Sequence, residues 1–199
     1  MKQFWEERYQ QDEYAYGIEP NVFLKAYLED RTPGRLLLPA EGEGRNAIFA
    51  SKLGWEVEAF DFSKEGRRKA MELAVQQDTS ISYHLADYAS FQPVLKPFEL
   101  VALIYTHSGP KDRRVFHQKL MDWVAPGGEI ILEGFSKGQL GRDSGGPKNS
   151  DMLWSLEELK EDFASLTITH ESELEITLNE GAYHQGHASV VRLIARKGT

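Results

Sequence analysis

The stretch LLLPAEGEGRNA, residues 36–47, decides the fold of this 199-residue chain. It reads as an apolar strand, then a loop of small and acidic residues, then the start of a helix. In an open α/β sheet, ligands bind at this kind of junction, at the carboxyl ends of the strands. Because Gly42 and Gly44 carry no Cβ, the loop either lets a ligand approach the backbone closely or forms a tight turn without a ligand.

Short apolar segments alternate with amphipathic helices on both sides of this loop, which is typical of an α/β fold with a mostly parallel sheet. The continuous apolar run within 98–104 predicts a central strand that is buried on both faces. The predicted strands are residues 35–39, 56–60, 81–85, 98–104, 129–135, 166–178 and 187–197. The predicted helices are residues 44–53, 63–76 and 111–124, and one that begins at the Ser155/Glu158 capping box.

The last two predicted strands are separated only by residues 179–186. A parallel crossover needs about a dozen residues or more, so these strands are expected to pair as an antiparallel hairpin. The sequence therefore predicts five parallel strands followed by an antiparallel hairpin, which is not the plain dinucleotide-binding arrangement.

The composition excludes several classes of function. With 23 basic and 31 acidic residues the net charge is −8, and such a surface repels nucleic-acid phosphates. The absence of cysteine excludes disulfides, thiolate nucleophiles and Cys-ligated metal sites. No signal-like segment or run of about 18 apolar residues is present, so we expect a soluble, cytoplasmic protein with neither a membrane nor a nucleic-acid partner.

Asp61 lies at the end of the second predicted strand. A carboxylate at this position can accept hydrogen bonds from both ribose hydroxyls of a nucleoside, or it can cap the helix that begins at Ser63. A dinucleotide fingerprint would have a third glycine where this chain has Arg45, and Glu41 and Glu43 stand where phosphates would lie. The acidic loop favours a cationic nucleoside without phosphate, which indicates S-adenosylmethionine rather than a nicotinamide dinucleotide.

The chain resembles the class I S-adenosylmethionine-dependent methyltransferases over nearly all of its length. Residues 36–47 are similar to the first motif of that family, residues 57–63 to the second, and residues 86–88 to the segment that binds adenine. The Pro-Gly-Gly turn at 126–128 also matches. Within the class, the segments 4–9, 16–17 and 20–24 look similar to the tellurite-resistance and thiopurine methyltransferase-like branch.

This resemblance implies a Rossmann-like sheet of seven strands, mostly parallel with an antiparallel terminal strand, and helices on both faces. It also implies a single methyltransferase domain over residues 1–199, with an amino-terminal helical lid at 1–30 and a core at 35–199. The expected activity is in-line methyl transfer to a small-molecule nucleophile by a monomer or homodimer, with no metal.

Two other functions stay open from the sequence. One is a nicotinamide-dependent oxidoreductase, which shares the glycine loop and the acidic residue after the second strand. The other is a non-catalytic module that binds S-adenosylmethionine. Leu38 and Ala40 motivate the second alternative, because the family usually has an acidic residue and a glycine at these positions.

The expected site residues fall into three groups. Cofactor contacts are expected from the glycine loop and from the ends of the next three strands: Ala40, Glu41, Gly42, Glu43, Gly44, Arg45, Asn46, Asp61, Phe62, Ser63, Asp87, Tyr88 and Tyr105. His107 is expected as the general base or a substrate contact, with Tyr105 and His184 as further catalytic candidates. An aromatic lid, or a helix packed on the core, is expected from Trp5, Tyr9, Tyr16 and Phe23.

Two of these roles have an explicit alternative. Arg45 is expected either to pair with the cofactor's carboxylate or a nearby glutamate, or to be solvated. Asp87 is expected either to accept a hydrogen bond from the adenine amine or to cap a turn, while Tyr88 donates from its backbone.

Overall fold

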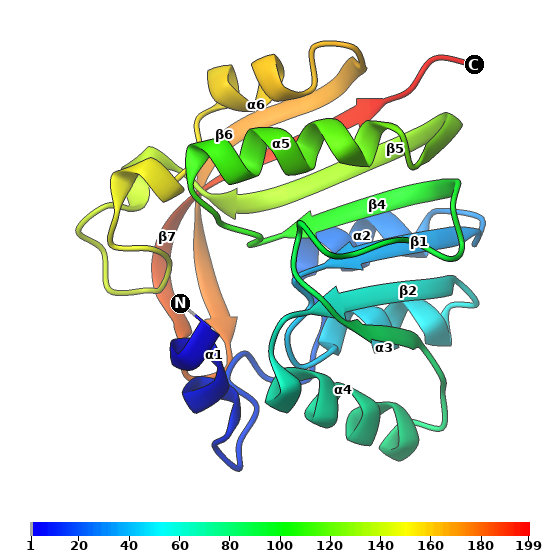
Figure 1. The fold of residues 1–199 in the computed structure, drawn as a ribbon. Coiled ribbons are helices and arrows are strands. Elements are labelled where there is room, and N and C mark those ends of the chain that lie inside the picture. The colour runs from blue at the N-terminus through cyan, green and yellow to red at the C-terminus, as the bar shows by residue number, and fades with distance from the viewer. Residues whose placement is uncertain (1) are drawn as a thin grey trace. The chain divides into compact units, whose positions relative to one another are not determined.

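A computed structural model describes residues 2–199, and its strands follow the order β3-β2-β1-β4-β5-β7-β6 (Figure 1). β1 pairs in parallel with β2, β2 with β3, and β4 with β5, whereas β7 runs antiparallel to β5. The predicted seven-stranded sheet with an antiparallel terminal strand is therefore confirmed.

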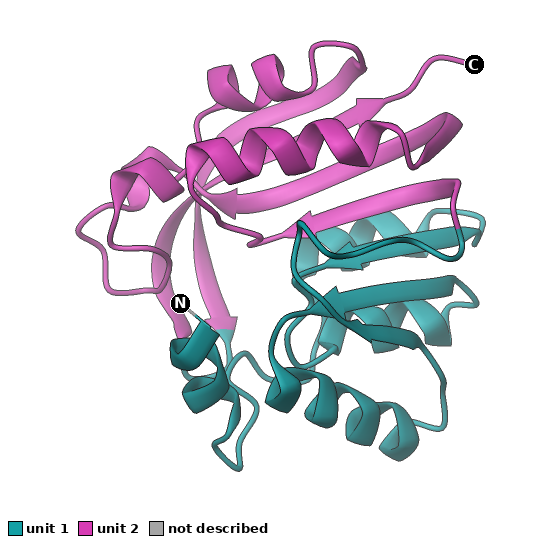
Figure 2. Cartoon of the chain, viewed as in Figure 1, with its two compact units in different colours: residues 1–95, 180–182 teal, residues 96–179, 183–199 magenta. Residues whose placement is uncertain are grey.

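The chain divides into two compact units, unit 1 (residues 1–95 and 180–182) and unit 2 (residues 96–179 and 183–199) (Figure 2). The assignment of a single domain stays a prediction.

Unit 1 contains three parallel strands and four helices. These elements are α1 (Lys2–Tyr9), α2 (Val22–Glu29), β1 (Arg35–Pro39), α3 (Arg45–Lys52), β2 (Glu56–Asp61), α4 (Lys64–Gln76) and β3 (Ser82–Leu85). Leu36, Leu37 and Leu38 of β1 are fully buried and form part of the core. Pro39 pairs with Phe60, so the loop that follows β1 lies beside the end of β2.

Helices α2 and α4 of unit 1 each begin after a residue whose side chain caps the helix. Ser63 caps α4 as predicted, with its hydroxyl accepting from the Gly66 N–H at 3.0 Å. The Asn21 side chain caps α2 by accepting from the Leu24 N–H at 3.0 Å. Helix α3 instead begins at Gly44, which has no side chain, so its cap has to come from elsewhere in the loop.

Unit 2 contains β4 (Phe98–Ile104), α5 (Pro110–Met121), β5 (Val124–Phe135), α6 (Leu156–Asp162), most of β6 (Thr167–Glu180) and β7 (His184–Arg196). Two short 3-10 turns lie at Lys137–Gln139 and Ser150–Met152. β5 begins five residues before the predicted start at residue 129. The pairing of β5 with β4 extends to both sides of the Pro-Gly-Gly turn, because Val124 pairs with Phe98 and Glu129 pairs with Leu100. A register shift between these two pairs accommodates the extra residues of β5.

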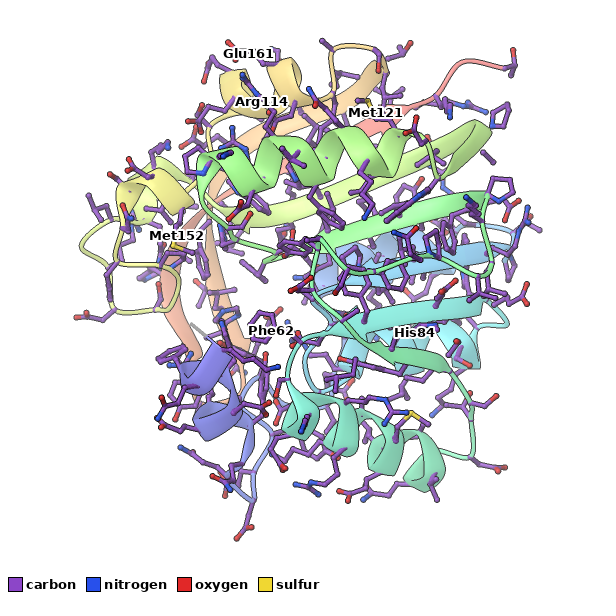
Figure 3. All side chains as sticks on the ribbon, viewed as in Figure 1. Phe62, His84, Arg114, Met121, Met152 and Glu161 are labelled. Atoms are coloured by element: carbon purple, nitrogen blue, oxygen red, sulfur yellow. The ribbon has the colours of Figure 1, made fainter. Side chains whose placement is uncertain are left out.

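Helices α5 and α6 of unit 2 are joined by charged side chains. Arg113 donates to Asp162 at 2.7 Å, and His117 shares a hydrogen bond with the same carboxylate at 2.9 Å. At the surface Arg114 of α5 pairs with Glu161 of α6 at 2.9 Å (Figure 3). The predicted capping box of α6, formed by Ser155 and Glu158, is confirmed. None of the helices described within residues 2–199 is long and apolar enough to cross a membrane.

Candidate functional site

The loop after β1 is compact because two of its glycines lie directly against neighbouring side chains. Gly42 has φ +60° and Gly44 has φ +87°, conformations that glycine adopts easily. A Cβ on Gly42 would lie 2.6 Å from the Tyr9 hydroxyl, and one on Gly44 would lie 2.6 Å from the Ala70 Cβ. Side chains of unit 1 therefore fill the Cβ directions of both glycines, as in the tight turn expected as the alternative, and close approach of a ligand to the loop backbone stays a prediction.

Glu41 supplies the missing cap of α3. Its Oε1 accepts hydrogen bonds from the backbone N–H groups of Asn46 and Ala47, both at 2.8 Å. Burial raises the pKa of Glu41 to about 7, although these hydrogen bonds oppose the rise. The carboxylate thus satisfies two amides at the positive end of the helix and does not point into solvent.

Asp61 ends β2 with both carboxylate oxygens on backbone amides. Oδ2 accepts from the Gly42 N–H at 3.1 Å, and Oδ1 accepts from the Ser63 N–H at 2.8 Å. Burial raises the pKa of Asp61 to about 6 against these hydrogen bonds. From β3, the Tyr83 hydroxyl donates to the Gly42 carbonyl at 2.6 Å. The structure therefore brings the glycine loop and Asp61 together, as the sequence predicted.

Glu43 fastens the glycine loop to α4 and to the amino-terminal segment. Its carboxylate pairs with the Lys69 ammonium at 2.8 Å and accepts from the Ala15 N–H at 2.8 Å. The same ammonium donates to the Glu13 carbonyl at 2.7 Å. Burial raises the pKa of Glu43, although Lys69 and the backbone donors oppose the rise. Both loop glutamates are thus buried, hydrogen-bonded groups.

Arg45 and Asn46 are engaged by the protein itself. The Arg45 guanidinium pairs with Glu180 at 2.8 Å and donates to the carbonyls of Tyr16 and Glu19 at 3.3 and 3.2 Å. Pairing with a glutamate was one of the expected roles of Arg45, and full solvation is wrong, since the residue is buried. The Asn46 side chain accepts from the Asn21 N–H at 2.9 Å. These two residues hold unit 1 together, and their contacts with a cofactor stay predictions.

Helix α1 is attached to the start of α4 by Glu6, a residue that the sequence did not single out. Its carboxylate accepts from the Ser63 hydroxyl at 2.8 Å and from the N–H groups of Lys64 and Glu65 at 2.9 and 3.1 Å. Burial favours a higher pKa for Glu6, but these hydrogen bonds hold its pKa below the ordinary value. Glu6 therefore acts as a second cap on α4, supplied from a distant segment.

Three of the four expected lid residues form one aromatic cluster in unit 1. Trp5 stacks on Tyr9 with a centroid separation of 5.4 Å and lies 6.3 Å from Tyr16. Tyr9 is buried, and Arg8 donates to the Tyr16 hydroxyl at 2.9 Å. Phe23 lies apart in the sequence, on α2. The cluster covers Gly42 through Tyr9, so the lid and packing interpretations of this segment remain compatible.

The structure decides the roles of the residues that follow β2 and β3 less clearly than it decides the role of Asp61. Phe62 is partly buried and follows β2 at the end nearest α1 and the start of α4 (Figure 3). The Asp87 Oδ1 accepts from the Ala89 and Ser90 N–H groups at 3.1 and 2.8 Å, so this side chain forms the turn expected as the alternative. Tyr88 meets the ring of Phe60 edge-on at 6.1 Å. Their contacts with adenine stay predictions.

In unit 2, Tyr105 follows β4 in a conformation that is unusual for its residue type. Its φ is +54°, in the left-handed region that is strained for side chains with a Cβ. Its ring lies 4.7 Å from Phe135 and 4.6 Å from His184. Its hydroxyl donates to Glu133 at 3.1 Å, and that carboxylate also pairs with Arg192 at 2.6 Å.

His107 is not a free base, which corrects the sequence-based expectation. Its Nδ1 lies 2.8 Å from the Met152 carbonyl, and its Nε2 accepts from the Phe135 N–H at 3.0 Å. This pattern requires the proton on Nδ1. Burial lowers the pKa of His107 to about 3. Both ring nitrogens therefore hold backbone groups of unit 2, and His107 acts as a structural cross-link.

His184 begins β7 as a buried side chain against Tyr105 and Phe135. Its catalytic role stays a prediction. Across residues 2–199, no group of three or more His, Asp or Glu side chains has the arrangement of a metal site.

The sequence did not single out Glu6, Lys69, Tyr83, Glu133 or Arg192. Each binds a segment far away in the chain, so no local motif marks it. A charged residue in an apolar strand pattern is the one available signal, and it applies to Glu133 in β5 and to Arg192 in β7.

Part of the chain matches a known protein family. Residues 39–128 match a family model described as "Methyltransferase domain". No curated protein matches the sequence. The matched range contains the glycine loop, Asp61 and Tyr105.

Solved structures agree with this match. One described as "Conversion of a Disulfide Bond into a Thioacetal Group during Echinomycin Biosynthesis" has a TM-score of 0.81 at 16% identity and covers 100% of this chain and 92% of that chain. TehB from Haemophilus influenzae has a TM-score of 0.73 at 16% identity, with coverages of 98% and 66%. ChlM from Synechocystis PCC 6803 with bound SAM has a TM-score of 0.66 at 14% identity, with coverages of 88% and 77%. At these identities the similarity establishes the fold.

Proposed function

We propose that the chain is a class I S-adenosylmethionine-dependent methyltransferase and that it transfers the methyl group to a small-molecule nucleophile. The net charge of −8 disfavours a nucleic-acid acceptor. ChlM is named as a magnesium protoporphyrin IX methyltransferase, so one structural neighbour acts on a small molecule.

The observation that carries the proposal is the state of Asp61. A carboxylate offers about four acceptor sites, and the amides of Gly42 and Ser63 use two of them. Capacity is left for a donor hydroxyl, which is what a ribose presents. The amides fix the carboxylate beside the glycine loop, so it is oriented before a nucleoside arrives. Asp61 thus fits the role of ribose ligand.

The charges of unit 1 also suit a cationic nucleoside. Burial raises the pKa values of Glu41 and Asp61, which shows that their negative charge is poorly solvated. A bound cation would compensate this charge, whereas a pyrophosphate would oppose it. When bound, S-adenosylmethionine supplies an electrophilic methyl group on a sulfonium centre. The residues of unit 1 then bind and orient, and need not exchange a proton.

Helix α1 is suited to exclude water. Glu6 ties it to the start of α4, next to Phe62 and Ser63 of the second motif, and Tyr9 covers Gly42 of the first. One helix therefore contacts both cofactor motifs. We assign Trp5, Tyr9 and Tyr16 to a lid that orders these motifs and keeps water from the reacting atoms.

In unit 2, Tyr105 and His184 are the candidates for contact with the methyl acceptor. Tyr105 follows the carboxyl end of β4, where open α/β sheets bind ligands. His107 positions Tyr105 indirectly. It accepts a hydrogen bond from the Phe135 N–H, and the ring of Phe135 packs on Tyr105. Holding a nucleophile in line at contact distance contributes about 7–11 kcal/mol, so position rather than acid–base chemistry is the main requirement.

Calorimetry and a transfer assay test the proposal. We expect S-adenosylhomocysteine to bind at micromolar concentrations and NADH to show no heat of binding. With methyl-labelled S-adenosylmethionine, label should pass to a member of a panel of thiols, selenite, iodide and heterocyclic amines. Binding of NADH alone would overturn the cofactor assignment. Label found only on RNA or on protein would overturn the small-molecule assignment, and binding without any transfer would favour the non-catalytic module.

A further inference from the structure

Tyr105 is held in a strained conformation by its surroundings. Among the described residues, the non-glycine residues with a positive φ are Ala40, Asp78 and Tyr105. Tyr105 has the largest φ of the three, +54°. A left-handed conformation costs a residue with a Cβ about 1–2 kcal/mol. Such strain persists where neighbouring groups over-determine the backbone, and it concentrates at functional sites. The groups that hold Tyr105 therefore indicate what its position is for.

Glu133 of β5 holds Tyr105 at both ends. Its main-chain carbonyl accepts from the Tyr105 N–H at 2.8 Å, and its carboxylate accepts from the Tyr105 hydroxyl at 3.1 Å. The rings of Phe135 and His184 fix the plane of the phenol between these two points. One residue thus determines where the Tyr105 backbone lies and where its hydroxyl proton points.

Arg192 fixes Glu133 in turn. The two residues are directly opposite each other in the antiparallel β5–β7 pair, and the Arg192 Nε donates to the second carboxylate oxygen at 2.6 Å. The Glu133 side chain is 1% exposed and the Arg192 side chain is 21% exposed. Hydrogen bonds between a guanidinium and a carboxylate are charge-assisted, short and strong. The order of donation therefore runs from Arg192 to Glu133 and from Tyr105 to Glu133.

This order decides how Tyr105 acts on other groups. A phenol has one proton, and here that proton is committed to Glu133, so toward a substrate the oxygen acts only as an acceptor. Donation to a charged group also makes the oxygen a better acceptor. An X–H group that donates to this oxygen keeps its own lone pair, which forms the bond to the methyl carbon as the bond between that carbon and the sulfonium breaks and its electron pair goes to sulfur. The proton then stays on the methylated product or is released from it to water.

Building on the proposed function, we propose that Glu133 and Arg192 are positioning residues that hold the Tyr105 hydroxyl as a hydrogen-bond acceptor for the nucleophile. The favoured methyl acceptor then carries hydrogen on its nucleophilic atom, as thiols and amines do and halides do not. Neither Glu133 nor Arg192 needs to touch the substrate.

Acceptor discrimination tests this arrangement. We expect Tyr105→Phe and Glu133→Gln each to lower kcat/KM at least tenfold for the thiol or amine of the panel, mainly through KM, and to change it less than twofold for iodide. In the Tyr105→Phe background, Glu133→Gln should have no further effect. The matched control is Asp162→Asn, which breaks another buried Arg–carboxylate pair of unit 2 and should leave the thiol-to-iodide ratio unchanged.

Additive losses, or an equal loss for iodide, would overturn the proposal. NMR of protein labelled with ¹³Cζ-tyrosine tests it without turnover, because Tyr105→Phe assigns the Tyr105 signal. That signal should shift in Glu133→Gln and in Arg192→Gln but not in Asp162→Asn, and a signal that stays in place would overturn the proposal. Calorimetry with S-adenosylhomocysteine distinguishes failure of the positioning role from failure of the proposed function. Normal binding in all variants supports the cofactor site, even where the expected changes in kcat/KM are absent.

Discussion

The glycine-loop region of unit 1 and the Tyr105 region of unit 2 hold their polar groups by different means. In unit 1, Glu41 and Asp61 accept from backbone amides as close as two, five and six positions away in the chain. In unit 2, Tyr105 and His107 are held by partners 28 and 45 positions away. Local backbone bonds form whenever the loop forms, whereas distant partners meet only once the whole unit has folded. A substitution should therefore disturb the local geometry of the loop in the first region and contacts between distant segments in the second.

Gly42→Val should break the first region most severely. The new side chain would be strained at φ +60° and would meet the Tyr9 hydroxyl. We expect at least a hundredfold loss of S-adenosylhomocysteine affinity, about 2.7 kcal/mol, because the loop, Asp61 and α1 all contact this residue. Calorimetry measures the loss, and Gly42→Ala serves if the valine variant does not fold. Gly109→Ala in unit 2 is the control, since no atom lies within 4 Å of its Cβ position. Retained affinity in Gly42→Val would show that the cofactor binds elsewhere.

Asp61→Ala tests the binding role without steric conflict. It should weaken S-adenosylmethionine binding at least tenfold, about 1.4 kcal/mol, because the ribose hydroxyls lose a charged acceptor. Calorimetry on Asp61→Ala and on the exposed Asp122→Ala of unit 2 gives the comparison. An unchanged dissociation constant for Asp61→Ala would exclude this carboxylate as the ribose ligand.

Glu41 in the first region and His107 in the second should make the stability of the protein depend on pH in opposite directions. Burial raises the pKa of Glu41 to about 7, so the native chain binds this proton first and gains stability as pH falls from about 8 to 6. Burial lowers the pKa of His107 to about 3, so the unfolded chain binds that proton first and stability is lost as pH falls below about 6.5.

Urea denaturation across this pH range measures both effects. The free energy of unfolding of the native sequence minus that of Glu41→Gln should rise by about 1 kcal/mol between pH 8 and pH 6. The free energy of unfolding of the native sequence minus that of His107→Gln should fall by about 1 kcal/mol between pH 7 and pH 5.5. Slopes of equal sign would mean that burial shifts one of the two pKa values in the opposite direction.

Glu6→Gln should have a smaller effect, because it weakens one contact between α1 and the cofactor motifs. The amide keeps one acceptor oxygen but loses the charge that faces the start of α4. We expect methyl transfer to fall about threefold, about 0.6 kcal/mol, with little change in the melting temperature. The exposed neighbour Glu7→Gln is the matched control. If S-adenosylhomocysteine protects residues 10–13 from protease equally well in both variants, Glu6 does not control the lid.

The same contrast explains how much the sequence could predict. The strand bounds 35–39 and 98–104 and the caps Ser63 and Ser155 follow from patterns within a few residues, and the structure confirms them. The neighbourhood of the glycine loop and Asp61 also follows, since parallel strands bring their carboxyl ends to one edge.

The rest depends on pairs that no local pattern encodes. Glu6 with Ser63, Lys69 with Glu43, and Glu133 with Arg192 are 57, 26 and 59 positions apart. The prediction of His107 as a general base is wrong for the same reason. A histidine that follows a strand is a reasonable candidate for a base, but its two backbone partners come from distant segments and meet it only in the folded unit.

Ala40→Gly should have a similarly small effect and compares the two strained residues directly. Ala40 follows β1 at φ +50° as Tyr105 follows β4 at +54°. Glycine removes about 1–2 kcal/mol of backbone strain but adds about 0.4–1 kcal/mol of unfolded-state entropy, so the free energy of unfolding should rise by about 0.5–1 kcal/mol. Tyr105→Gly relieves the same strain but should destabilise the protein, because it also removes the ring contacts and the hydrogen bond to Glu133. Urea denaturation compares both with Asp78→Gly, a third left-handed position outside the site. A loss of stability in Ala40→Gly would mean that the methyl group of Ala40 packs well enough to outweigh its strain.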